Sequence, residues 1–144
     1  NQGHILVIQD KLNKTIQYQT VTYLQEITQL PFDFSTLQDL IIADVPCTGS
    51  GTWGRNPEQL YYFNASSINE YSTLQKKIIS NAIPKLMPGG YFLYITCSVF
   101  RNENEENVQF LQEKFNLELI SSRTLKGYDQ KADTMFSALL KSRL

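Results

Sequence analysis

The chain has 144 residues, of which 42% are hydrophobic and 19% charged, and its formal net charge is −1. This mixture is typical of one globular domain with its own core. The slight acidic excess does not favour a stand-alone nucleic-acid-binding module, although an enzyme that works with a basic partner domain remains compatible with it. The sequence has no apolar run long enough to span a membrane, and its first residues do not resemble a secretory signal.

Cysteine and histidine are scarce. The chain has two cysteines, Cys47 and Cys97, and one histidine, His4. Two cysteines do not make the disulfide framework of a secreted protein, so we expect a cytoplasmic location. Without a histidine cluster or a Cys-x-x-Cys pair, no metal site is expected. A cysteine hydrolase would need His4 as its base, so hydrolysis is not favoured either.

The first third of the chain predicts two strands. Residues 4–9 read as a strand that ends at Asp10, whereas residues 20–30 fit a strand or a helix equally well. Residues 40–43 form a continuous apolar run, which is typical of a strand buried on both faces of a parallel sheet. A loop with two prolines and several glycines follows over residues 44–57.

The middle of the chain predicts a helix and then another strand. Apolar residues recur from residue 68 at spacings of three and four, which makes one helical stripe: Ile68, Tyr71, Leu74, Ile78, Ala82 and Leu86. Pro84 should kink or end this helix, and Pro88-Gly89-Gly90 should provide the stop and the turn. Residues 91–96 are aromatic and branched, so they predict a second buried strand, which leads directly into Cys97.

The last part of the chain predicts one helix and two strands. Residues 104–115 form the helix, with acidic residues in its first turn and Val108, Leu111 and Phe115 facing inward. Residues 117–122 and 135–141 read as strands. The order of elements predicts a doubly wound α/β fold with an antiparallel edge.

Two strand ends are therefore expected to meet. A strand–helix–strand crossover makes its strands parallel, so residues 40–43 and 91–96 should be parallel neighbours. Their carboxyl ends carry Asp44 and Cys47 on one strand and Cys97 on the other. Ligands bind at this edge of open α/β sheets, so the sequence predicts one cleft that contains all three side chains.

Three kinds of chemistry fit a carboxylate and two thiols at a sheet edge. The cysteines can be buried hydrophobes with the aspartate capping a loop, they can belong to a metal site, or one can be a nucleophile. The loop favours the nucleophile. Pro46 stiffens the exit from the strand, Gly49 and Gly51 permit positive φ or close approach of a flat ligand, and Arg55 can hold a phosphate.

Two stretches in this order resemble the RsmB/NOL1/NOP2/Sun family of RNA cytosine-5 methyltransferases. "DVPCTGSGTWGRNPE", from residue 44, resembles the family's Asp-x-Pro-Cys-Ser/Thr-Gly-x-Gly signature. "LMPGGYFLYITCSVFRNENEENVQFL", from residue 86, resembles its second signature, with Thr-Cys-Ser at a strand end. "KADTMFSALLKSRL", from residue 131, is only weakly similar to the family's final strand.

The resemblance implies a reaction and a role for each site residue. It implies S-adenosylmethionine-dependent methylation of RNA, ribosomal or transfer, at C5 of a cytosine. Cys97 matches the cysteine that attacks C6, and Cys47 matches the second cysteine, which assists product release. Asp44 matches the residue that contacts the base and lies near the methionine end of the cofactor. DNA cytosine-5 enzymes use the Pro-Cys cysteine instead, so the choice of Cys97 depends on the resemblance.

The resemblance also implies residues that bind the cofactor and the RNA. Pro46 belongs to the cofactor side with Asp44, and Asp10 matches either a ribose-binding or an adenine-side carboxylate. A strand-end turn explains Asp10 equally well. Arg55 and Asn56 match the part of the first signature expected to contact RNA.

One expected part of the fold is missing from the sequence. The family's glycine-rich cofactor loop has no counterpart, because Gly3 is the only glycine before Gly49. We therefore expect residues 1–144 to form a partial Rossmann-like methyltransferase domain. It would be the carboxyl-terminal half, with a mostly parallel sheet, an antiparallel edge, and the first strand and glycine-rich loop absent. Such a chain should bind the cofactor poorly and be inactive alone.

Three further alternatives stay open at this level. The chain can be a non-catalytic platform that retains the fold and binds RNA or protein. An uncovered sheet edge would invite pairing of two copies of the fragment. Tyr61, Tyr62 and Phe63 can stack on RNA bases, or they can form a local core cluster.

Overall fold

The computed structural model describes residues 3–11, 15–23 and 37–143. These residues form one sheet of six strands in the spatial order β2-β1-β3-β4-β6-β5. The strands are β1 (Gly3–Lys11), β2 (Thr15–Tyr23), β3 (Gln38–Asp44), β4 (Leu86–Thr96), β5 (Leu117–Leu125) and β6 (Met135–Ser142). Most of the predicted strands are thus present, and the undecided segment 20–30 enters β2 as far as residue 23, beyond which it lies outside the described residues.

Three α-helices accompany the sheet: α1 (Glu58–Tyr61), α2 (Ser66–Ala82) and α3 (Glu105–Phe115). The predicted effect of Pro84 is confirmed, because α2 ends at Ala82 and a single 3₁₀ turn, Ile83–Lys85, leads into β4. The acidic first turn of α3 is also confirmed and contains Glu105 and Glu106. Within the described part of the chain, no helix has the length and apolar character needed to cross a bilayer.

The central pair of strands has the predicted direction. β3 and β4 are parallel, with Asp44 opposite Ile95, so their carboxyl ends reach the same edge. The expectation of a mostly parallel sheet is wrong, because the four other pairings are antiparallel. Parallel neighbours need a crossover, which α2 provides between β3 and β4. The consecutive strands β1 and β2, and β5 and β6, pair antiparallel, and β3 and β4 add β1 and β6 as antiparallel neighbours that are not consecutive to them in sequence.

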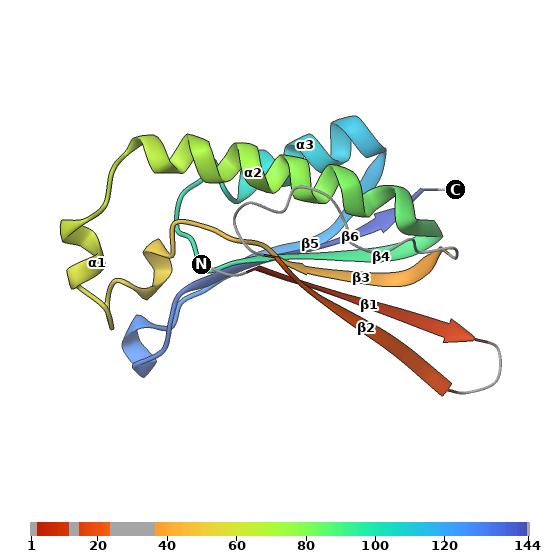
Figure 1. Cartoon of the computed structure of the whole chain (residues 1–144), viewed down its shortest axis with the longest axis horizontal. Helices are drawn as coiled ribbons and strands as arrows, with labels where there is room; N and C mark the ends of the chain where they lie inside the picture. Colours follow the sequence, from red (N-terminus) through yellow and green to blue (C-terminus); the bar gives the residue numbers. More distant parts are fainter. Residues whose placement is uncertain (1–2, 12–14, 24–36, 144) are drawn as a thin grey trace.

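Both long helices lie on one face of the sheet (Figure 1). The expectation of a doubly wound fold is therefore wrong for the described residues, which place no helix on the opposite face. Alternate residues of β4 point toward the helices, and Phe92 and Tyr94 are fully buried there against Ile78 of α2 and Leu111 of α3. The same strand's Leu93 and Ile95 are only half-buried.

The start of β4 differs from its prediction. Pro88-Gly89-Gly90 was expected to end one element before a strand at residue 91, but β4 already begins at Leu86 and includes these three residues. Gly89 adopts a φ of +78°, and the register against β3 shifts between Gln38 and Leu40. The three residues therefore form an irregularity inside a strand, which a glycine with positive φ permits.

Candidate active site

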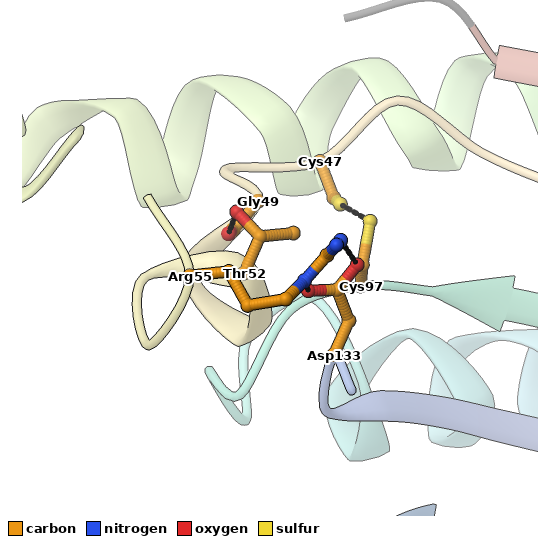
Figure 2. Close-up of polar contacts among 6 residues, drawn as sticks. All are labelled: Cys47, Gly49, Thr52, Arg55, Cys97 and Asp133. Atoms are coloured by element: carbon orange, nitrogen blue, oxygen red, sulfur yellow. Dashed lines mark hydrogen bonds and ion pairs between the residues drawn. The ribbon is translucent and has the colours of Figure 1, made fainter. Parts of the chain in front are cut away.

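The edge formed by β3 and β4 brings the two cysteines into contact. The Val45 amide donates a hydrogen bond to the Ile95 carbonyl over 3.1 Å, which extends the pairing just beyond the two strand ends. Cys47 and Cys97 follow, and their sulfurs are 3.6 Å apart although fifty residues separate them in the sequence (Figure 2). The predicted convergence of the two strand ends is thus confirmed.

A cavity of about 320 Å³ opens beside this pair, within the size range of small-ligand pockets. Its lining combines the end of β3, the loop that follows and the start of α1: Asp44, Val45, Pro46, Cys47, Thr48, Gly49, Thr52, Asn56, Gln59 and Cys97. Asp44, the third side chain expected at this edge, therefore shares the cavity with both cysteines. Among the residues that the structure describes, the lining has acidic, thiol and amide groups but no ammonium or guanidinium group.

The two sulfurs differ in exposure and in acidity. Cys47 is only 2% exposed, whereas Cys97 is partly accessible. The hydrogen bond from Cys47 lowers the pKa of Cys97, against the opposing effects of burial and of the carboxylates of Asp44 and Asp133. The same hydrogen bond, together with burial, raises the pKa of Cys47. Of the two sulfurs, the accessible Cys97 is therefore the one whose surroundings favour the thiolate.

Two glycines shape the loop after Cys47 in different ways. Gly49 has a φ of +72°, which is the positive φ that the sequence analysis offered as one reason for a glycine in this loop. Its carbonyl accepts hydrogen bonds from the amide and hydroxyl of Thr52 (Figure 2). Gly51 instead lies against protein backbone. Its amide donates to the Cys97 carbonyl over 2.8 Å, and its carbonyl accepts from the Thr134 amide over 2.9 Å. The loop is thereby fixed to both neighbouring segments of the site.

A buried carboxylate lies behind the cysteine loops and was missed by the sequence analysis. Glu103 is completely buried and accepts hydrogen bonds from the amide of Thr48 over 3.0 Å and from its hydroxyl over 2.6 Å. The Ser98 hydroxyl donates to the same carboxylate over 2.6 Å, and the Gln75 amide group donates over 2.9 Å. Its only signal in the sequence was its place inside the second signature, five residues after Ser98.

The family model named 16S rRNA methyltransferase RsmB/F matches residues 5–141 of this chain. The chain belongs to this family. The match covers β1 to β6, and so it includes both cysteine loops and the resemblance noted from the two signatures alone.

Individual rRNA methyltransferases F and B are also similar to this chain, over shorter stretches than the family model. Ribosomal RNA small subunit methyltransferase F of Cronobacter sakazakii is 35% identical over 77 residues, which cover 54% of this chain and 16% of the relative. Methyltransferase B of the same organism is 41% identical over 71 residues, or 49% of this chain and 17% of the relative. The matched part of the chain thus spans about a sixth of each of these relatives.

A solved structure supports the partial methyltransferase fold. The methyltransferase homolog protein from Pyrococcus horikoshii superposes with a TM-score of 0.63 at 25% identity, over 74% of this chain and 40% of that one. The α/β fold expected from the sequence is therefore that of an RsmB/F family member, with the corrections to strand direction and helix placement given above.

The two residues expected to contact RNA, Arg55 and Asn56, lie in different surroundings. The Arg55 guanidinium makes a two-point ion pair with Asp133, with Nε–Oδ1 and Nη2–Oδ2 distances of 2.6 and 2.5 Å (Figure 2). This pair lowers the pKa of Asp133 and joins the loop after β3 to the segment before β6. Asn56, by contrast, lines the cavity together with Gln59, which the sequence analysis did not single out.

Asp10 does not join the site. β1 is antiparallel to β3, with His4 opposite Asp44 and Ile8 opposite Leu40. Asp10 lies further along β1, so the register places it at the edge of the sheet opposite to Asp44. The expected cofactor contact of Asp10 assumed that the strand before it points toward the ligand edge, and the observed strand direction removes that assumption.

The aromatic residues after the loop have two kinds of surroundings. Phe63 stacks on Phe100 with ring centroids 5.5 Å apart and contacts Trp53 at 4.9 Å, so it belongs to a local cluster. Tyr61 and Tyr62 are 86% and 78% exposed and have no part in that cluster.

Proposed function

We propose that the protein containing this chain methylates C5 of a cytosine in RNA through a covalent bond between Cys97 and C6 of the base. The single observation that carries the proposal is the contact between the Cys97 and Cys47 sulfurs in a cavity that also contains Asp44. Membership of the RsmB/F family supports it, and the relatives named ribosomal RNA methyltransferases favour ribosomal RNA as the substrate, with transfer RNA as the other candidate.

Cys97 would act as the nucleophile because it is the more accessible sulfur and has the lowered pKa. Its thiolate forms a bond to C6. The electron pair of the C5–C6 double bond moves toward C5 and N3, which makes C5 nucleophilic. Asp44 lines the same cavity and would contact the N3 edge of the base, where a proton stabilises the adduct.

Cys47 would assist the last step. After C5 carries its methyl group, a base takes the C5 proton, and the electron pair of that C–H bond restores the C5–C6 double bond and expels Cys97 as a thiolate. The S–H group of Cys47, 3.6 Å from that sulfur, can donate a hydrogen bond to the departing thiolate and so stabilise the leaving group.

Replacing Cys47 tests this division of roles. In the full-length protein, we expect Cys47→Ser to accumulate the covalent RNA adduct, because a serine hydroxyl is a shorter group and no longer meets the leaving sulfur at the same place. The adduct would appear as a slowly migrating species on a denaturing gel with substrate RNA. The Cys47→Ser/Cys97→Ser double variant should form none, and normal turnover by Cys47→Ser with a trapped adduct in Cys97→Ser would reverse the assignment.

The residues present fit one side of an S-adenosyl-L-methionine site. Asp44 and Pro46 line the cavity at the strand edge, so they would hold the amino-acid end of the cofactor. When bound, the cofactor supplies the methyl group. We propose that residues 1–144 are the carboxyl-terminal part of a catalytic domain, because no glycine-rich loop precedes Gly49 and Asp10 lies at the other edge of the sheet.

The cofactor proposal predicts weak binding by the chain alone. We expect isothermal titration calorimetry of the 144-residue chain with S-adenosyl-L-methionine to give no affinity in the low-micromolar range, since this sequence supplies residues for only one end of the ligand. Low-micromolar binding would contradict this expectation and would require another cofactor-binding element among residues 1–144.

RNA contacts are proposed for Arg55 and Asn56. Arg55 remains 55% exposed in its ion pair with Asp133, so its outer guanidinium face can meet a phosphate while the inner face is held. Asn56 lies in the cavity lining, where its amide can hydrogen-bond a base or a sugar. The ion pair thus orients Arg55 at the mouth of the site instead of preventing its use.

A further inference from the structure

Glu103 is an acid without a role in the mechanism given above, yet it is completely buried next to both cysteine loops. A buried carboxylate is costly unless its oxygens receive hydrogen bonds. Here every group that contacts its oxygens is a donor: the amide and hydroxyl of Thr48, the hydroxyl of Ser98 and the side-chain amide of Gln75. Such a set matches the ionised carboxylate, which only accepts hydrogen bonds.

The donors come from both sides of the candidate active site. Thr48 directly follows Cys47, and Ser98 directly follows Cys97. One carboxylate oxygen, Oε1, accepts from both hydroxyls over 2.6 Å each, and the two hydroxyls are 3.3 Å apart. A single atom of Glu103 therefore joins the residues next to the two cysteines.

The attachment of Glu103 is rigid on its other side as well. The Glu103 carbonyl accepts a 2.6 Å hydrogen bond from the fully buried Tyr94 hydroxyl and a 3.2 Å bond from the side-chain amide of Asn107. The Gln75 amide that donates to the carboxylate also donates to the Pro46 carbonyl over 2.8 Å. Glu103 is thus held at its carboxylate by α2 and at its main-chain carbonyl by β4 and α3.

We propose that Glu103 is a positioning residue for the reaction of Cys97: its carboxylate fixes the spacing of the two cysteine loops and keeps a negative charge on the Cys47 side of the pair. The proposal rests on the proposed function for the meaning of the two cysteines. The geometry itself, one buried acid bonded to both loops, is independent of that function.

The charges around the two sulfurs support this role. Glu103 adds to the effects that raise the pKa of Cys47, of which the hydrogen bond to Cys97 and burial are the largest. The phenols of Tyr71 and Tyr94 also interact with Cys47, and burial raises the pKa of both, so both remain neutral. On the Cys97 side lie the carboxylates of Asp44 and Asp133, the latter paired with Arg55. Glu103 therefore opposes transfer of the thiolate from Cys97 to Cys47.

Thiol alkylation of the chain tests the proposal without RNA or cofactor. Iodoacetamide labelling, followed over pH and read by peptide mass spectrometry, gives a rate for each cysteine. We expect Cys97 to react faster in the unchanged chain. Glu103→Gln keeps the shape but removes the charge that opposes ionisation of Cys47. In this variant the ratio of Cys97 to Cys47 labelling should fall about tenfold, because Cys47 takes a larger share of the thiolate.

The matched control is Glu105→Gln, which changes an exposed acid two residues away and should leave both profiles unchanged. A Glu103→Gln protein that folds and keeps the original ratio would overturn the proposal, even if its stability falls. If Glu103→Gln does not fold, Ser98→Ala removes one donor to the carboxylate and the link from Glu103 to the Cys97 loop. We then expect a smaller fall in the Cys97 to Cys47 labelling ratio. An unchanged ratio in Ser98→Ala would overturn the proposal.

Kinetics of the full-length protein separate this role from the proposed function. We expect Glu103→Gln to lower kcat for RNA methylation about tenfold while KM for RNA stays the same, because the carboxylate is buried behind the loops. If the full-length protein did not methylate RNA, the proposed function would fail while the labelling result could still stand. A rise in KM with unchanged kcat would contradict the positioning role.

Discussion

Replacing Cys97 with serine should reduce methylation by the full-length protein by about 10⁴-fold or more, the scale of loss when a nucleophile is removed. A serine hydroxyl is far less acidic than a thiol, and the Cys47 S–H group beside it is not a base that could activate it. The measurement is single-turnover transfer of labelled methyl groups to substrate RNA, with enzyme in excess.

Binding and folding serve as controls for the Cys97→Ser result. The affinity for RNA and the free energy of unfolding should change little, because the substitution is small and the residue is partly exposed at the cavity wall. A Cys97→Ser protein that keeps more than about a tenth of the original rate would contradict the assignment of the nucleophile.

Gly51→Ala, which adds a single methyl group to the loop after Cys47, should disrupt the site. A Cβ atom on this residue would lie 2.0 Å from the Thr134 carbonyl oxygen and 2.9 Å from the Cys97 carbonyl oxygen, both of which belong to backbone. The loop must shift, which strains or breaks the two backbone hydrogen bonds of Gly51. We expect Gly51→Ala to lower the free energy of unfolding by about 3 kcal/mol and to abolish most of the activity.

Gly54 provides a matched control in the same loop. A Cβ atom there would meet no atom within 4 Å, and its φ is not positive. Urea unfolding of both variants should therefore show a clear loss of stability for Gly51→Ala and a change within about 0.5 kcal/mol for Gly54→Ala. Equal effects of the two substitutions would show that the contact of Gly51 with Cys97 and Thr134 does not fix the loop.

The convergence of the two cysteines could be predicted from the sequence because it depends on local patterns and one general rule. Residues 40–43 and 91–96 are short apolar runs joined through a helix, and such a crossover makes its strands parallel neighbours. Once the strands are parallel, Cys47 and Cys97 must reach the same edge. No knowledge of the remaining sheet was needed.

The direction of β1 could not be predicted in the same way. A strand has the same alternating or continuous apolar pattern whichever way it runs, and its direction is set by pairing with residues far along the chain. The expectation that Asp10 lies at the ligand edge depended on that direction. The observed antiparallel pairing with β3 places Asp10 at the other edge.

Glu103 illustrates why buried polar partners are difficult to predict. Residues 103, 105 and 106 are all glutamates, and an acid near a helix start suits the helix dipole. Glu103 instead precedes α3, in a turn where its amide donates to the Phe100 carbonyl, and this turn directs it inward. Which of the three acids is buried therefore depends on where the turn ends and the helix begins.

Arg55 shows the complementary case of a partner far away in the sequence. A basic residue in a glycine-containing loop was expected to hold a phosphate. Its ion-pair partner, Asp133, lies 78 residues further along the chain. The contact requires the loop before β6 to meet the loop after β3, which only the folded chain determines.

The central claim is that Cys97 attacks the base while Cys47 stays protonated beside it. RNA that contains 5-fluorocytosine at the target position tests it, because fluorine replaces the C5 proton and the adduct cannot be resolved after methyl transfer. Digestion of the trapped complex of the full-length protein, followed by peptide mass spectrometry, identifies the cysteine that carries the nucleotide. The account predicts the peptide that contains Cys97, and a nucleotide attached to Cys47 would contradict it.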